Sequence, residues 1–333
     1  MAQCFSEIIG HQDIIGHLKE AIRQGRVSHA YLLTGEKGSG RRMMAGAFAM
    51  ALECRESLDD ACLVCESCRK ARHQSHPDII YVTHEKSGVI TVDEIREQVV
   101  NTAALKPYES PYKIYIIPDA DKMNVQAQNA LLKTLEEPPA YAVFLLLSVS
   151  AEALLPTIVS RCTVLDIRPL SQTAVKEFLI RQHSLPDYEA EIAAAFSQGN
   201  IGRAREAVLS EEFMMMTERI VILLRRIEEA STVELVDFIR ILTAEKQNIQ
   251  EYLDMLTIWF RDVLMYKATR EIDRLIFKKE ISDIREQAEK ASYHGIQEIL
   301  ESLDKAGARL RANVSFELTM ELLLLSIREN LNG

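Results

Sequence analysis

Residues 35–42 read Gly35-Glu36-Lys37-Gly38-Ser39-Gly40-Arg41-Arg42, and they follow the short apolar run Tyr31-Leu32-Leu33-Thr34. An active phosphate-binding loop reads G-x-x-x-x-G-K-[ST]. Its glycines let backbone N–H groups surround phosphates, its Lys reaches the outer phosphates, and its hydroxyl binds Mg²⁺. Here both end glycines stand at the required spacing, but Arg41 replaces the Lys and Arg42 replaces the Ser or Thr. Because a cation cannot ligate Mg²⁺, the stretch predicts the fold of an ATPase without its chemistry.

Around this loop, short β-like runs alternate with helical segments through the first half of the chain. Continuous apolar runs of this length are typical of strands in a sheet that is covered on both faces. Strands alternating with helices predict an α/β domain with a parallel sheet. The expected strands are residues 31–34, 79–82, 113–117, 143–149 and 163–167, and the expected helices include 91–102 and 125–137.

After Pro169 the strand signals stop. Ser171 has the chemistry of a helix cap, and residues 171–209 have room for three short helices. From residue 211 onward the pattern is helical and contains no Pro. The sequence therefore predicts three parts: 1–167, 168–210 and 211–333. We expect the last helix to carry an apolar stripe, formed by Leu310, Val314, Leu318, Leu322 and Leu325.

The overall composition limits the class of protein. Lys and Arg number 39 against 49 Asp and Glu, giving a net charge of -10, so the chain lacks the basic footprint of a protein that binds nucleic acid by itself. No apolar run approaches the length that spans a bilayer, and no signal peptide is evident at the N-terminus. We expect a cytosolic protein without membrane contact, in which six cysteines are free thiols or metal ligands.

Four of these cysteines form a compact motif with the spacing C-x7-C-x2-C-x2-C. Four thiolates this close in sequence suit tetrahedral coordination of a structural Zn²⁺ ion. An iron–sulfur cluster is an alternative, although a ferredoxin run continues with another Cys, which is absent here. Unliganded thiols remain the third reading, and Cys4 and Cys162 lie outside the motif. The motif consists of Cys54, Cys62, Cys65 and Cys68.

An active ATPase of this type also needs an acidic pair after an apolar strand, for Mg²⁺ and for the attacking water. In this chain the strand at 113–117 is followed by Pro118-Asp119-Ala120-Asp121. Pro118 takes the place of the metal-ligating Asp, and Asp119 takes that of the catalytic carboxylate. We favour a structural role instead, in which Asp119 and Asp121 form a strand-end turn with a helix cap. With the Lys, the hydroxyl and the metal ligand all missing, we expect no ATP turnover and no functional ATP site.

Two further blocks carry a family resemblance. Residues 129–139 read Asn129-Ala130-Leu131-Leu132-Lys133-Thr134-Leu135-Glu136-Glu137-Pro138-Pro139, and twenty residues later comes Ser160-Arg161-Cys162. Together with residues 5–11 and 29–33, they resemble bacterial sliding-clamp loader subunits of the AAA+ class, over nearly all of residues 1–205. The resemblance implies an α/β AAA+ domain with a zinc-binding insertion at 1–167, a helical lid at 168–210, and a helical collar at 211–333 that assembles a ring.

The family also implies roles for particular residues. Its Ser-Arg-Cys arginine, here Arg161 after Ser160, reaches into the ATP site of a neighbouring subunit. Ser148 and Arg203 match the positions of family residues that sense nucleotide, and without a functional site we expect them to be structural. The degraded loop resembles that of the family's non-hydrolysing subunits.

This membership would place the chain in a hetero-oligomer with the ATPase subunits and a clamp-opening subunit. It would meet the sliding clamp and primer–template DNA through that complex, as part of a DNA polymerase assembly. Two alternatives stay open. The first is a clamp-loader subunit that binds nucleotide or hydrolyses it weakly. The second is a zinc-stapled adaptor or nucleic-acid-binding module without a role in ATPase assembly.

Overall fold

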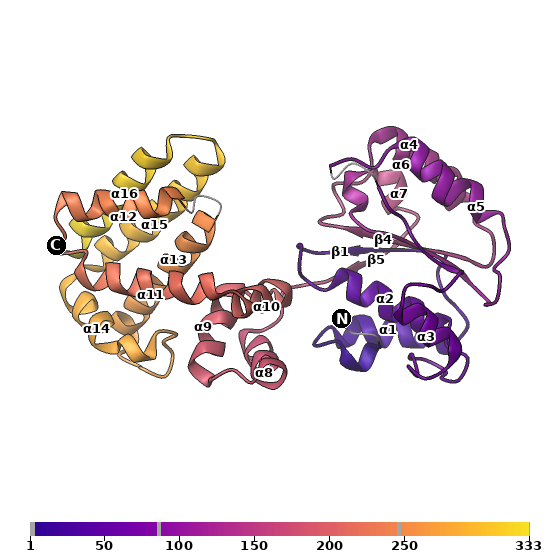
Figure 1. Cartoon of the computed structure of the whole chain (residues 1–333), viewed down its shortest axis with the longest axis horizontal. Helices are drawn as coiled ribbons and strands as arrows, with labels where there is room; N and C mark the ends of the chain where they lie inside the picture. The colour runs from indigo at the N-terminus through magenta and orange to yellow at the C-terminus, as the bar shows by residue number, and fades with distance from the viewer. Residues whose placement is uncertain (1–3, 85–87, 245–247, 333) are drawn as a thin grey trace. The chain divides into compact units, whose positions relative to one another are not determined.

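The computed structural model describes residues 4–84, 88–244 and 248–332, and it begins with a five-stranded sheet flanked by helices (Figure 1). All pairings in the sheet are parallel, in the order β2-β3-β4-β1-β5. The five predicted strands are therefore confirmed, as is the α/β class. The strands are β1 (Ala30–Thr34), β2 (Ile79–Tyr81), β3 (Lys113–Ile117), β4 (Ala142–Ser148) and β5 (Thr163–Asp166).

Side chains of β1 alternate between two hydrophobic clusters, one on each face of the sheet. Tyr31 and Leu33 belong to the cluster covered by α1, α2 and α3, whereas Ala30 and Leu32 belong to the cluster covered by α4 to α7 (Figure 1). All five residues of β1 are buried, which explains why its sequence is continuously apolar rather than alternating. The helices are α1 (Gln12–Arg23), α2 (Arg41–Leu52), α3 (Glu66–Arg72), α4 (Val92–Ile95), α5 (Asn101–Ala103), α6 (Val125–Glu136) and α7 (Pro156–Val159).

Local capping chemistry sets where several of these helices begin. Thr91 and Glu94 form a capping box at the start of α4. A π-helical turn at Arg96–Val100 joins α4 to α5, so the helix expected at 91–102 is present with one irregular turn. At the start of α6, the side chain of Asn124 accepts a hydrogen bond from the N–H of Ala127. The helix expected at 125–137 is therefore also confirmed.

The chain divides into two compact units, Met1–Leu170 with Asn200–Gly202, and Ser171–Gly199 with Arg203–Gly333. The second contains only helices of the α and 3₁₀ types within its described residues. Its first helix starts as predicted, with the Ser171 hydroxyl accepting from Ala174 N–H. The α-helices of the C-terminal half are α8 (Gln172–His183), α9 (Asp187–Ser197), α10 (Ile201–Leu209), α11 (Glu211–Arg226), α12 (Thr232–Ala244), α13 (Ile249–Thr269), α14 (Ile281–Lys290), α15 (Tyr293–Arg311) and α16 (Phe316–Leu331).

The prediction that five apolar residues form one stripe on the last helix is wrong. A break separates α15 from α16, with Asn313 in the left-handed region at φ 58° and Ser315 capping α16. The predicted stripe runs across this break, with Leu310 in α15 and Val314 between the two helices, so its members do not all belong to the last helix. Leu318 and Leu322 are 52% and 46% exposed. The face of α16 that is buried instead carries Phe316, Met320, Leu323, Leu324, Ile327 and Leu331.

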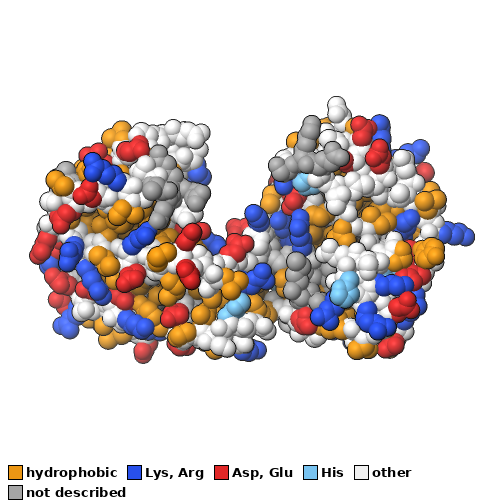
Figure 2. Space-filling model, viewed as in Figure 1, with side chains coloured by type: hydrophobic (Ala, Val, Ile, Leu, Met, Phe, Trp, Pro, Cys, Tyr) orange, Lys and Arg blue, Asp and Glu red, His pale blue; other side chains and the backbone are white. Residues whose placement is uncertain are grey.

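Charged side chains of both signs are spread over the surface. On the face shown in Figure 2, Lys and Arg side chains are interspersed with Asp and Glu. Across the ranges that the structure describes, none of the helices is long and apolar enough to cross a membrane.

Candidate functional site

The phosphate-binding loop lies between the end of β1 and the start of α2, as its sequence predicts. Gly40 takes the N-cap position of α2 with φ 101°. Gly35 has φ 147°, and a Cβ atom there would lie 2.6 Å from the Ile167 carbonyl oxygen. The glycines of the motif are thus required by backbone shape and close packing, whatever the loop binds.

A short segment from far along the chain packs directly onto this loop. The Asn200 side chain is buried, and its Nδ2 donates to the Lys37 carbonyl at 2.8 Å. The N–H of Gly202 donates to the Gly38 carbonyl at 2.9 Å. A Cβ atom on Gly38, which has φ 90°, would lie 2.5 Å from Asn200 Oδ1. Two loop carbonyls are therefore used to bind the start of α10.

The contact between Gly38 and Gly202 gives a stability prediction. A Cβ atom on Gly202 would lie 2.6 Å from the Gly38 Cα, and neither backbone can move aside cheaply. We expect Gly202→Ala to lower the free energy of unfolding by about 1–3 kcal/mol, as overpacking does elsewhere. The measurement is the midpoint of thermal unfolding of the purified chain.

Gly46→Ala is the matched control, since Gly46 lies inside α2 with open space around its Cα. We expect this variant to raise the free energy of unfolding by about 0.5–1 kcal/mol, because alanine favours the helix. Equal midpoints for the two variants would contradict the close approach of Gly38 and Gly202.

The two arginines of the loop face the acidic turn after β3. Arg41 is buried, and its Nη1 atom has no hydrogen-bond partner within the described residues. Burial lowers the pKa of Arg41, while the nearby carboxylates of Asp121 and Asp119 act in the opposite sense. Arg42 is exposed, and its Nη2 lies 3.6 Å from Asp119 Oδ2. Lys122 Nζ lies 3.4 Å from the same oxygen, so Asp119 is flanked by two cations of its own chain.

The turn itself follows the sequence prediction except in one respect. Pro118 follows β3, and Asp119 adopts the left-handed conformation with φ 52° at the start of the 3₁₀ turn Ala120–Lys122. The side chain of Asp119 makes no cap hydrogen bond, so the predicted helix cap is wrong. Asp121 instead accepts from the N–H of Val149, and the Ser148 hydroxyl donates to the Ser150 carbonyl at 2.6 Å. Both side chains stabilise the loop after β4.

Arg161 follows α7 and is held by three acceptors of the same unit. Its Nη2 lies 2.7 Å from Glu136 Oε1. Its Nη1 donates to the Thr157 carbonyl at 2.8 Å and to the Ser160 hydroxyl oxygen at 3.4 Å. About a third of the Arg161 side chain is exposed. The guanidinium is therefore ordered and still accessible from outside.

Strand register places Arg161 far from the phosphate loop of its own chain. Thr163 of β5 pairs with Tyr31 of the adjacent, parallel β1. Gly35 lies four residues beyond Tyr31, which is about 13 Å at the usual rise of a strand. Arg161 precedes Thr163 and so lies toward the opposite end of the strands. An arginine side chain does not span this separation.

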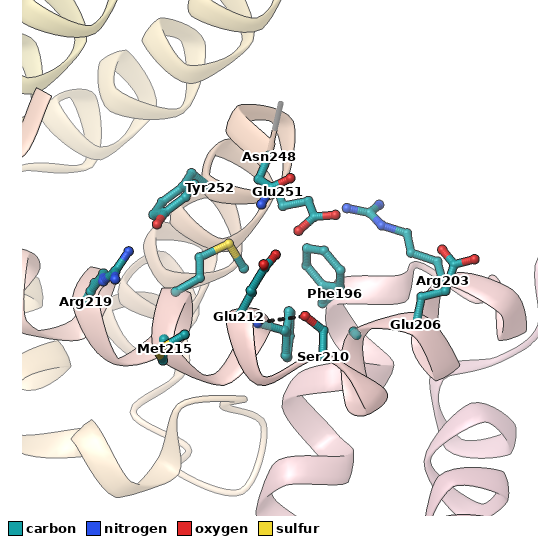
Figure 3. Close-up of a pocket in the computed structure, with 13 residues that line it drawn as sticks. Phe196, Arg203, Glu206, Ser210, Glu212, Met215, Arg219, Asn248, Glu251 and Tyr252 are labelled. Atoms are coloured by element: carbon teal, nitrogen blue, oxygen red, sulfur yellow. Dashed lines mark hydrogen bonds between the residues drawn. The ribbon is translucent and has the colours of Figure 1, made fainter. Parts of the chain in front are cut away.

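Arg203, which matches a nucleotide-sensing position, is engaged inside the helical unit (Figure 3). It forms an ion pair with Asp254 of α13, and its guanidinium carbon lies 4.1 Å from the centroid of the Phe196 ring. Both Arg203 and Phe196 line a cavity of about 350 Å³. Burial raises the pKa of Glu251 in the same cavity, and the charge of Arg203 opposes that shift. These partners support the structural role that we expected for Arg203.

The cysteine motif forms one cluster. The Sγ atoms of Cys54, Cys62, Cys65 and Cys68 all lie within 4.8 Å of one another. Zinc–sulfur bonds of about 2.3 Å in a tetrahedron place sulfurs about 3.8 Å apart, and the Cys62 and Cys68 sulfurs are 3.9 Å apart. Backbone N–H groups of Ser57, Cys65 and Cys68 donate to the sulfurs of Cys54, Cys62 and Cys65, respectively. The donor set therefore fits a zinc ion.

The loop between the first two cysteines also binds the N-terminal segment. Asp60 accepts from the N–H groups of Phe5 at 2.9 Å and Ser6 at 3.3 Å, and Lys19 Nζ lies 3.2 Å from its Oδ2. Asp59 forms an ion pair with Arg23. The cysteine loop thus connects the 3₁₀ turn at Phe5–Glu7 with α1.

Sequence reasoning did not assign a role to three residues at these sites: Glu136, Asn200 and Gly202. Glu136 stands in the block at 129–139 that carries the family resemblance, and Asn200 and Gly202 stand in the segment Gly199-Asn200-Ile201-Gly202. Their partners lie 25 to 164 residues away, so spacing alone gives no signal.

Comparison with known proteins adds an independent result. A family model described as DNA polymerase III, delta subunit, matches residues 10–171, and its C-terminal counterpart matches residues 223–329. The delta' subunit of DNA polymerase III from Bacillus subtilis is 30% identical over 317 residues, covering 94% of each chain. The tau subunit from the same organism is 25% identical, over 93% of this chain and 58% of its own length. A solved gamma subunit-related protein from Thermotoga maritima is 20% identical, with a TM-score of 0.46, covering 95% of this chain and 99% of its own.

Proposed function

Because the chain belongs to the delta' subunits of DNA polymerase III, in the clamp-loader family, we propose that it supplies Arg161 to the ATP site of a neighbouring ATPase subunit and hydrolyses no ATP itself. The observation that carries this proposal is the placement of Arg161. It lies accessible at one end of β5, whereas the loop of its own chain follows the other end of β1. A phosphate that meets Arg161 therefore belongs to another molecule.

The chemistry of the guanidinium suits this role. Arginine is permanently charged and offers paired donors that match phosphate oxygens. Placed on a different chain from the nucleotide, such a group makes hydrolysis depend on correct assembly. Ser160 would take part through its hydroxyl oxygen, which lies 3.4 Å from Arg161 Nη1.

Three features around the chain's own phosphate loop support a nucleotide site that does not hydrolyse ATP. Arg42 stands where a hydroxyl would hold Mg²⁺, and Pro118 stands where a carboxylate would. Asp119, at the place of the catalytic carboxylate, is paired with Arg42 and Lys122. Each feature removes or occupies a group that ATP hydrolysis requires.

A measurement on the purified chain tests the idle site. We expect no release of phosphate from Mg-ATP above the rate of the buffer blank, because no group positions the metal or the water. Calorimetric titration with Mg-ATP shows whether the loop binds nucleotide without hydrolysing it or does not bind nucleotide at all. Phosphate release that disappears in the Asp119→Asn variant would identify a true activity of this chain and overturn the proposal.

We also propose that Cys54, Cys62, Cys65 and Cys68 hold a structural Zn²⁺ ion. When bound, such an ion cross-links the loop that these residues share. The spacing of the sulfurs and the N–H···S hydrogen bonds to Cys54, Cys62 and Cys65 support this assignment. The cysteines of this chain would then order the segment that holds Asp59 and Asp60.

In the proposed complex the chain contributes three parts: an AAA+ domain at 1–167, a lid at 168–210 and a collar at 211–333. The similarity to the tau subunit supports a clamp-loader complex that contains subunits of that kind, and we propose that the ATPase subunits are among them. The proposal further includes the clamp-opening delta subunit, with the sliding clamp and primer–template DNA met through the complex. The net charge of -10 argues against tight DNA binding by this chain alone.

A further inference from the structure

The guanidinium of Arg161 is oriented by a carboxylate from a different helix. Glu136 is the last residue of α6, and its Oε1 lies 2.7 Å from Arg161 Nη2. Thr157 and Ser160 accept from the other terminal nitrogen. Two of the three acceptors belong to the turn that carries Arg161, so only Glu136 ties the guanidinium to a separate element.

Glu136 lies on α6 and Arg161 follows α7, and a hydrogen bond links these two helices. Gln128 of α6 is buried, and its Oε1 accepts from the N–H of Leu155, the residue that precedes α7. Its Nε2 donates to the Met123 carbonyl. The start of α6 is in turn capped by Asn124. Glu136 therefore lies on a helix that is tied to the start of α7 through the buried Gln128 side chain.

The ion pair with Glu136 orients Arg161 and still leaves N–H donors of the guanidinium available for a phosphate. A guanidinium has five N–H groups, and the three contacts above use three of them. At least two donors remain, enough for paired hydrogen bonds to a phosphate. Both side chains are substantially exposed, 34% for Arg161 and 48% for Glu136, so the ion pair is weak and adjusts readily.

We propose that Glu136 is a positioning residue for Arg161: it holds the guanidinium in the orientation in which the neighbouring subunit's nucleotide meets it. Free arginine side chains sample many rotamers, and Glu136 limits that sampling before the complex forms. This inference rests on the proposed function of Arg161 and adds to it a second residue of the same chain.

The test uses the reconstituted clamp-loader complex with Glu136→Ala in this subunit, and ATP hydrolysis stimulated by primed DNA as the readout. We expect kcat to fall about two- to fivefold, as the loss of an exposed ion pair allows, with KM for ATP unchanged. Glu137→Ala is the matched control. Glu137 is an exposed neighbour with the same charge, and its substitution should leave both constants unchanged.

Two further variants separate this inference from the proposed function. If Arg161→Ala leaves hydrolysis unchanged, the proposed function fails and the inference fails with it. If Arg161→Ala lowers hydrolysis but Glu136→Ala matches Glu137→Ala, the inference alone is overturned. In the double variant Glu136→Ala/Arg161→Ala, we expect the rate of Arg161→Ala alone, because Glu136 acts only through Arg161.

Two other results would also overturn the inference. A higher rate in Glu136→Ala would mean that Glu136 restrains Arg161. An effect that persists in the Arg161→Ala background would mean that Glu136 acts elsewhere. Thermal unfolding of the isolated variants checks the fold, and we expect midpoints equal to that of the unsubstituted chain.

Discussion

Replacing Arg161 with alanine should lower ATP hydrolysis at the adjoining ATP site by about 10³–10⁵-fold, the range found for arginines supplied in trans. The guanidinium neutralises charge that develops on the transferred phosphate. Water that enters in its place does not offer hydrogen bonds to that phosphate with the same geometry. In a complex with several ATP sites, the share of the total rate that belongs to this site should disappear. The measurement is steady-state hydrolysis by the reconstituted complex with primed DNA.

Two controls make this result specific. Arg96→Ala removes another exposed arginine of the same unit, whose nearest acidic partner, Asp93, is 3.9 Å away, and should leave the rate unchanged. Arg161→Lys keeps the charge but lacks the planar pair of donors, so it should remain strongly impaired. Normal hydrolysis by an assembled complex that contains Arg161→Ala would show that Arg161 is not the trans-acting group.

Loss of the metal should produce the largest change in stability. We expect Cys68→Ser to abolish binding of one zinc ion per chain, because Cys68 is a buried member of the four-sulfur cluster. Structural zinc contributes about 10–16 kcal/mol in small peptides, which matches or exceeds the total stability of many domains. The loop at 54–68 should therefore unfold, and its proteolysis by trypsin should accelerate.

Metal content by mass spectrometry and limited proteolysis are the two readouts, and neither depends on activity. Treatment of the unsubstituted chain with a strong chelator should reproduce the proteolysis pattern of Cys68→Ser. Cys162→Ser, which alters a cysteine outside the cluster, should retain the zinc. A purified chain that lacks zinc and yet resists proteolysis at 54–68 would contradict a structural role for the metal.

Features encoded by neighbouring residues were predictable from the sequence. The glycine spacing of the loop, the apolar runs of the five strands and the close cysteines each require only a short window of chain. These predictions succeed because buried parallel strands and metal knuckles have strong local signatures.

The parts that sequence reasoning missed depend on contacts between distant residues. The Asn200 amide reaches a loop carbonyl 163 residues away, and Glu136 meets Arg161 across 25 residues. On the last helix, apolar residues at helical spacing were read as one stripe. The break at Asn313 changed which leucines face the core. A spacing rule does not detect such a break, although Ser315 carries the cap that marks it.

The contacts of Asp60 bear on how the chain is made. Phe5, Ser6 and Lys19 leave the ribosome well before Asp60, and they have no carboxylate from the cysteine loop to bind until that loop has been synthesised. Because contacts between residues so far apart form late, the first helix should wait undocked during translation. Folding of the cysteine loop would then be the step that fixes the N-terminal segment in place.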